Sequence, residues 1–163
     1  MAENEILQGK KILVVDDELD ILATIEGILS MCDLTLASTF EEGKKNLESN
    51  PFDLAILDIM GVEGFALLEI AKEHNIMALI LTAHAHGLDT TIKSFKEGAV
   101  YYVPKASLVE LPKYLSDIFE AVEKGAKPSS RWLERFASYY ENWFGPKWKE
   151  EDKDFWKKFG GYV

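Results

Sequence analysis

Residues 53–65 read DLAILDIMGVEGF. The four apolar residues 54–57 run directly into an acid, Asp58, and a glycine-punctuated turn with a new helical pattern follows. A short apolar run bounded by turn residues is typical of a strand that is buried on both faces. A carboxylate at the end of such a strand costs free energy unless another group compensates its charge. The rest of the chain indicates which groups do so.

Strand and helix patterns alternate five times along the chain. The sequence predicts strands over residues 11–15, 34–37, 53–58, 76–82 and 100–103, and helices over residues 18–31, 40–49, 63–73, 88–97 and 107–124. Because the strands are apolar on both faces, we expect a parallel sheet that helices cover on both sides. Right-handed crossovers then give an α/β fold with a doubly wound five-stranded sheet, whose chemistry lies at the carboxyl ends of the strands.

Polar side chains follow four of these strands. The first strand ends in Asp16 and Asp17, the third in Asp58 and the fourth in Thr82, and the fifth runs into Lys105. Three neighbouring carboxylates repel one another unless a cation binds, and an all-oxygen set favours Mg²⁺ over zinc. A lysine and a hydroxyl suit the oxygens of an anion. The set therefore suits phosphoryl transfer onto a carboxylate.

The motifs KILVVDDE, DLAILD, ILTA and YYVPK resemble, in this order, the receiver domain of two-component response regulators. The resemblance covers roughly residues 9–125 and implies a flavodoxin-like fold. It also implies that Asp58 is the phosphoacceptor, which takes its phosphoryl group from a sensor histidine kinase or a phosphotransfer protein. Such a receiver is not a turnover enzyme, and it signals to a downstream protein partner by protein contact.

The same resemblance implies a metal site around the acceptor. Asp17 would bind Mg²⁺ directly and Asp16 would assist. Asp58 and the backbone carbonyl of Met60 would complete the set. In the family, the residues at the positions of Met60 and His84 tend to set the rate at which the phosphoryl group is lost.

The resemblance also assigns two catalytic residues, Thr82 and Lys105, and two switch residues, Thr82 and Tyr102. Thr82 would donate its hydroxyl to one phosphoryl oxygen, and Lys105 would pair with another. Tyr102 falls at the position of an aromatic residue that swings inward as the threonine moves.

One departure from the family pattern leaves an alternative open. The turn over residues 59–64 is shorter than the family's and lacks its proline, which favours a pseudo-receiver that acts as a binding scaffold without phosphorylation. The intact set of acids opposes that reading. A phosphatase of the haloacid dehalogenase type is disfavoured, because it needs an Asp-x-Asp motif at the first strand, where this chain has Asp16-Asp17-Glu18.

Composition limits the partners and the compartment. A net charge of −10 argues against nucleic acid as a direct partner. No apolar run reaches the length of a membrane span, the N-terminus lacks a signal-peptide core, and Cys32 is the single cysteine. We therefore expect a cytoplasmic protein that needs no membrane partner.

The last 38 residues differ from the rest in composition. Residues 126–163 hold eleven of the nineteen aromatic residues, including every tryptophan, and carry a net charge of +2. We predict a receiver domain over residues 1–125 and an aromatic-rich helical extension over residues 126–163. Two short amphipathic helices are expected there, separated by Gly145-Pro146. The aromatic faces of these helices either pack on the receiver or on each other, or they form a surface for a partner protein or a homodimer.

Overall fold

The computed structural model, which describes residues 3–83 and 87–159, contains a five-stranded parallel sheet in the order β2-β1-β3-β4-β5. The strands are β1 (Lys11–Val15), β2 (Asp33–Ala37), β3 (Leu54–Asp58), β4 (Ala78–Thr82) and β5 (Tyr101–Pro104). Every residue of β3 and β4 is buried, as the apolar runs predicted. The order reverses beside β1, where doubly wound folds open a crevice at the carboxyl ends of the strands.

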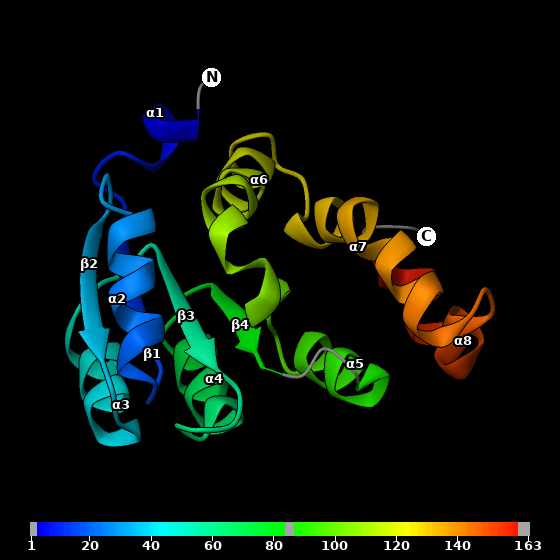
Figure 1. Ribbon diagram of the computed structural model, residues 1–163, viewed down its shortest axis with the longest axis horizontal. Helices are drawn as coiled ribbons and strands as arrows, with labels where there is room; N and C mark the ends of the chain where they lie inside the picture. Colours follow the sequence, from blue (N-terminus) through cyan, green and yellow to red (C-terminus); the bar gives the residue numbers. More distant parts are fainter. Residues whose placement is uncertain (1–2, 84–86, 160–163) are drawn as a thin grey trace.

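Helices alternate with the strands and cover both faces of the sheet (Figure 1). Those before the extension are α1 (Glu3–Leu7), α2 (Leu19–Ile28), α3 (Phe40–Ser49), α4 (Gly64–Glu73), α5 (Leu88–Lys96) and α6 (Leu111–Glu123). No described helix is long and apolar enough to cross a membrane.

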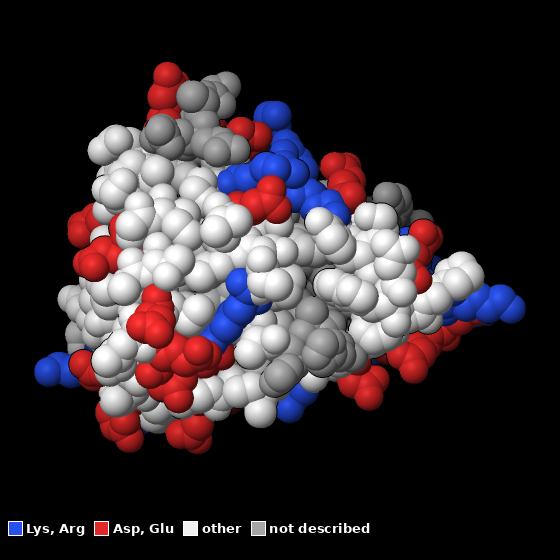
Figure 2. All heavy atoms as spheres, in the orientation of Figure 1, with Lys and Arg blue, Asp and Glu red and all other residues white. Residues whose placement is uncertain are grey.

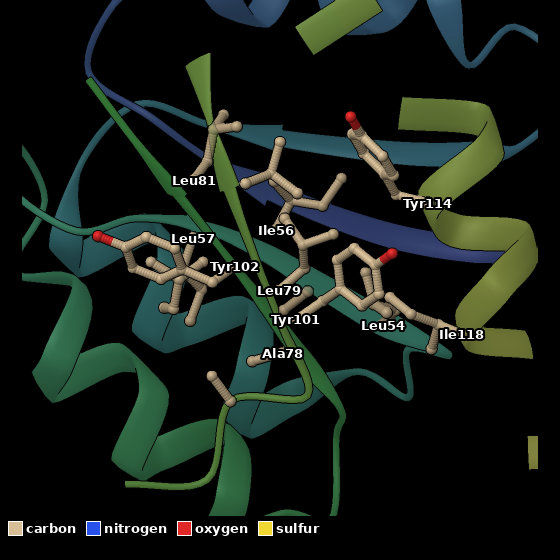
Figure 3. Close-up of a cluster of buried hydrophobic side chains, with 14 of the residues drawn as sticks. Leu54, Ile56, Leu57, Ala78, Leu79, Leu81, Tyr101, Tyr102, Tyr114 and Ile118 are labelled. Carbon is tan, nitrogen blue, oxygen red and sulfur yellow. The ribbon is translucent and has the colours of Figure 1, made fainter. Parts of the chain in front are cut away.

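The neighbours Tyr101 and Tyr102 show how β5 separates the two layers of helices. Successive residues of a strand point to opposite faces. Figure 3 shows Tyr101 pointing toward Tyr114 of α6, while Tyr102 points to the other side of the sheet. There the ring of Tyr102 lies 6.5 Å from that of Phe95 in α5. Helices α5 and α6 therefore flank β5 from opposite faces.

The helix expected from residue 107 begins later than predicted. A 3₁₀ segment, η1 (Lys105–Glu110), precedes α6, and Ser107 within it has non-helical dihedrals. Helix α6 starts at Leu111, which places Pro112 in its first turn, where a missing N–H breaks no helical hydrogen bond. The short helix α1 was not predicted at all. It packs against α6 and buries Ile6 and Leu7.

The extension is helical, as expected. It consists of α7 (Pro128–Phe144), the 3₁₀ segment η2 (Trp148–Asp152) and α8 (Lys153–Lys158). Gly145 ends α7 with a positive φ of 88°, and Asp152 caps α8 by accepting a hydrogen bond from the Phe155 amide. The aromatic face is buried against the rest of the fold, through Trp132, Phe136, Tyr140, Trp148, Trp156 and Phe159.

Candidate functional site

Asp58 ends the central strand β3 and is only 3% exposed. Lys105 follows β5 directly, and its Nζ lies 3.6 Å from Asp58 Oδ1, 3.0 Å from Asp16 Oδ2 and 2.7 Å from Glu18 Oε1. Burial lowers the pKa of Lys105, but the hydrogen bonds to Glu18 and Asp16 outweigh it and hold the pKa above its ordinary value. The lysine is therefore a permanent cation among three carboxylates.

Asp16, at the end of β1, is fully buried. Its Oδ1 accepts a hydrogen bond of 2.9 Å from the Glu18 amide. Burial raises the pKa of Asp16, and the nearby charge of Asp58 raises it further, against the lowering effects of the Glu18 amide and Lys105. An ionised Asp16 is therefore costly here unless a cation stays close to it.

Three consecutive carboxylates form an acidic cluster. Oxygens of Asp16, Asp17 and Glu18 all lie within 4.8 Å of one another. In Figure 2, acidic side chains gather at the lower left, near the carboxyl ends of the strands. Glu18 was not among the predicted site residues, although its place in the run Asp16-Asp17-Glu18 was a signal for it. Asp58 joins the cluster through Lys105.

The short turn after β3 folds tightly over the acceptor. The amides of Met60 and Gly61 lie 3.5 and 3.3 Å from the two carboxylate oxygens of Asp58, while the Met60 side chain is 75% exposed. A Cβ on Gly61 would lie 2.1 Å from Asp17 Oδ1, and a Cβ on Gly64 would lie 2.3 Å from the Asp58 carbonyl oxygen. Glycine at both positions lets the turn lie against Asp17 and β3.

Thr82 ends β4, and Tyr102 lies in the neighbouring strand β5, where the register pairs Tyr102 with Ile80 and Thr82 with Pro104. Both side chains are buried. Burial raises the pKa of Tyr102, and the hydroxyls of Thr91 and Thr82 oppose that rise. The Tyr102 ring is buried beside Phe95, and its hydroxyl lies near Thr91 and Thr82. His84 lies outside the described residues.

The structure thus brings Asp16, Asp58 and Lys105 together, with Asp17 and Glu18 beside them, at one edge of a doubly wound sheet. The family model described as "Response regulator receiver domain" matches residues 12–116. The chain belongs to the response regulator receiver family. Receivers typically bind Mg²⁺ at an acidic site, and this receiver has such a cluster.

Known relatives and solved structures agree with this assignment. The receiver is 36% identical over 104 residues to the two-component response regulator ARR18 of Arabidopsis thaliana, and 37% identical over 106 residues to the DNA-binding transcriptional regulator NtrC of Escherichia coli. These matches cover 60% and 61% of this chain but only 16% and 22% of the two relatives. A CheY-like receiver from Methanospirillum hungatei is 31% identical with a TM-score of 0.59, over 69% of this chain and 98% of the other.

Proposed function

We propose that this receiver takes a phosphoryl group onto Asp58 from the phosphohistidine of a sensor histidine kinase or a phosphotransfer protein. The observation that carries the proposal is the position of the Lys105 ammonium, 3.0 Å from Asp16 and 3.6 Å from Asp58 at the carboxyl edge of the sheet. A fixed cation at that place can pair with an oxygen of the incoming phosphoryl group, where charge builds up during transfer.

In the proposed reaction, a carboxylate oxygen of Asp58 forms a bond to phosphorus while the bond from phosphorus to the histidine nitrogen breaks. The electron pair of the broken bond returns to the imidazole, and the product on this chain is an acyl phosphate. Lys105 then shares its charge between Asp16 and a phosphoryl oxygen. The Thr82 hydroxyl donates to a second phosphoryl oxygen. The burial of Asp58 limits access of water to the product.

The acidic cluster fits Mg²⁺, because its oxygen donors are close together and the buried Asp16 gains from a nearby cation. We propose that Asp16, Asp17 and Asp58, with the backbone carbonyl of Met60, hold the ion. When bound, Mg²⁺ neutralises charge on the acceptor and on the phosphoryl oxygens. The close contact between Gly61 and Asp17 supports a turn shaped to lie at this site.

A protein phosphodonor suits the surface around the site. Leu19, Met60 and Val109 follow the ends of β1, β3 and β5, and all three are highly exposed. After the ends of β4 and β5, a hollow of about 260 Å³ is lined by Ala83, Pro104, Ala106 and Ser107 together with Phe136, Tyr139 and Trp143 of α7. Exposed apolar groups around a buried acceptor favour contact with another protein.

We propose further that residues 1–125 form the receiver and residues 126–163 an appended extension, and that the output is contact with a downstream protein or a second copy of this chain. The net charge of −10 supports a protein partner over nucleic acid.

The test is intact mass after incubation with Mg²⁺ and acetyl phosphate, a small acyl phosphate, with Asp58→Asn alongside. We expect one phosphoryl adduct on the natural chain and none on the variant. No adduct, together with no detectable Mg²⁺ binding, would favour the pseudo-receiver. Repeated turnover of a chromogenic phosphate ester would indicate a phosphatase, because a receiver releases at most one equivalent.

A further inference from the structure

Helix α7 of the extension packs against β5 and α6, and Figure 1 shows it beside α6. On the α6 side, Phe136 packs against the rings of Tyr101 and Tyr114. On the α5 side, the Trp132 ring lies 4.8 Å from that of Phe95 in an edge-to-face pair. The extension therefore covers the surface on which Tyr102 and α5 meet.

A line of buried hydroxyls joins the extension to the phosphoacceptor edge. The hydroxyl oxygens of Tyr140 in α7 and Thr91 in α5 lie 2.7 Å apart. The Tyr102 hydroxyl lies near both Thr91 and Thr82, which lower its pKa against the effect of burial. All four residues are buried, so water is not the competing partner for these groups. The line runs Thr82, Tyr102, Thr91, Tyr140.

The directions of these hydrogen bonds follow from counting protons. A hydroxyl has one proton to donate and two lone pairs. Thr91 donates its proton to the Gly87 carbonyl at 3.1 Å. Tyr140 must then be the donor to Thr91, which leaves one lone pair on Thr91. Among the described residues, the Tyr102 hydroxyl has no partner at full hydrogen-bond geometry. It is a buried donor between two possible acceptors, Thr91 and Thr82.

We propose that Tyr140 is a positioning residue for the phosphoacceptor site, acting through Thr91 and Tyr102 on Thr82, and that the extension is the resident partner of this surface. The inference rests on the proposed phosphorylation of Asp58. When the Thr82 hydroxyl donates its proton to a phosphoryl oxygen, Thr82 keeps lone pairs that can accept from Tyr102. Phosphorylation then favours the inward position of the Tyr102 side chain, which is the position that the docked extension covers.

Coupling of this kind is reciprocal. If phosphorylation favours the docked extension, the docked extension favours phosphorylation by the same factor in equilibrium terms. Tyr140→Phe keeps the ring that packs on Trp132 and removes only the donor to Thr91. Both lone pairs of Thr91 are then open to the Tyr102 proton instead of one, so Thr91 competes better with Thr82 for it. A change at the extension thus reaches the acceptor.

The experiment uses the full chain with Mg²⁺ and acetyl phosphate. Phosphorylation is followed by intact mass, and amide hydrogen exchange is followed in residues 128–144. We expect phosphorylation of the natural chain to slow exchange in α7 about fivefold, with no change in Asp58→Asn. In Tyr140→Phe we expect both the phosphorylation rate and the change in exchange to fall about fivefold.

The matched control is Tyr114→Phe. Tyr114 is also buried, and its hydroxyl bonds to Glu110 on the opposite face of the sheet. We expect this control to lose stability without losing the coupling. If Tyr140→Phe behaves like the control, Tyr140 has only a structural role and the inference is overturned. An adduct on the natural chain without a change in exchange overturns the coupling alone. No adduct on the natural chain overturns the proposed function and the inference with it.

Discussion

The indole nitrogen of Trp132 donates a hydrogen bond of 2.7 Å to the main-chain carbonyl of Tyr102. Within the described part of the chain, strand β5 is the last strand of the sheet and pairs with β4 alone, so its other side would expose unpaired backbone groups. Trp132 satisfies one of these groups with a fully buried side chain. The extension is thus tied to the backbone of the strand that carries Tyr102.

We expect Trp132→Phe to lower the free energy of unfolding by about 2 kcal/mol, because the Tyr102 carbonyl loses its buried donor and the smaller ring leaves space. Urea denaturation measures the change. The control is Trp143→Phe, the same substitution in the same helix at a side chain that is 45% exposed, where we expect almost no effect. Equal losses at the two positions would contradict the assigned role of Trp132.

A second group of hydrogen bonds joins α7 to α6. The buried carboxylate of Asp117 accepts hydrogen bonds from Arg135 Nε, from Arg135 Nη2 at 2.9 Å and from the Tyr101 hydroxyl at 2.9 Å. Only 4% of the Asp117 side chain is exposed, compared with 37% of Arg135. Removing the arginine therefore leaves a buried charge, with Arg131 Nη1 still 3.5 Å away, whereas removing the acid leaves a charge that water can reach.

From this asymmetry we expect Arg135→Met to cost about 3 kcal/mol of unfolding free energy and Asp117→Asn about 1 kcal/mol. Chemical denaturation of both variants near neutral pH checks the order. Equal losses, or a larger loss in Asp117→Asn, would show that Arg131 and Tyr101 are enough to stabilise the buried Asp117 carboxylate.

The contact between α8 and α5 should depend on pH. Lys96 Nζ lies 2.9 Å from Asp152 Oδ2, and this hydrogen bond, with the Phe155 amide, lowers the pKa of Asp152 from its ordinary value of 3.8. A carboxyl whose pKa is lower in the folded state stabilises that state above the unfolded pKa. The contribution is lost as the pH falls through the folded pKa.

We therefore expect Asp152→Asn, which keeps an acceptor for the Phe155 amide, to be less stable than the natural chain near neutral pH. The difference should shrink once the pH falls below 3.8 and then vanish. It should also shrink in high salt, since both side chains are accessible to solvent. Urea unfolding at several pH values measures it, and a difference that persists in acid would rule out the ion pair as its source.

The sequence predicted the positions of Asp16, Asp58, Thr82 and Lys105 well. Their strands are marked by apolar runs, and the carboxyl ends of parallel strands must share one edge. The sequence did not predict the contact of Glu18 with Lys105, because this contact depends on how far the Glu18 side chain, which follows β1, reaches toward the end of β5. Strand patterns place backbone ends but not long side chains.

The extension shows a different limit. Helical spacing of its aromatic residues predicted a buried face, but no pattern says which surface covers it. Of the adjacent residues Tyr139 and Tyr140, only Tyr140 is buried, and its partner Thr91 lies 49 residues earlier. Such a pairing follows from tertiary packing alone.

The close approach of Gly61 to Asp17 gives a further prediction. A Cβ at residue 61 would lie 2.1 Å from Asp17 Oδ1, so Gly61→Ala must displace either the turn or the carboxylate. We expect weaker Mg²⁺ binding by calorimetry and about tenfold slower phosphorylation by acetyl phosphate, which corresponds to about 1.4 kcal/mol. The control is Gly27→Ala in α2, where a Cβ meets nothing within 4 Å. That variant should gain about 0.5–1 kcal/mol of stability and keep its Mg²⁺ affinity.

The lifetime of the phosphoryl group should depend on Met60. Its side chain is 75% exposed and has no group that can orient a water molecule toward the acyl phosphate. Asp58 itself is almost completely buried, which limits the approach of water from other directions. We therefore expect loss of the phosphoryl group over minutes or longer, measured by intact mass after removal of the phosphodonor.

Met60→Asn should shorten the lifetime severalfold, while Val122→Asn, an exposed change on α6, should not. Hydrolysis of the natural chain within seconds would mean that another group near Asp58 positions the attacking water.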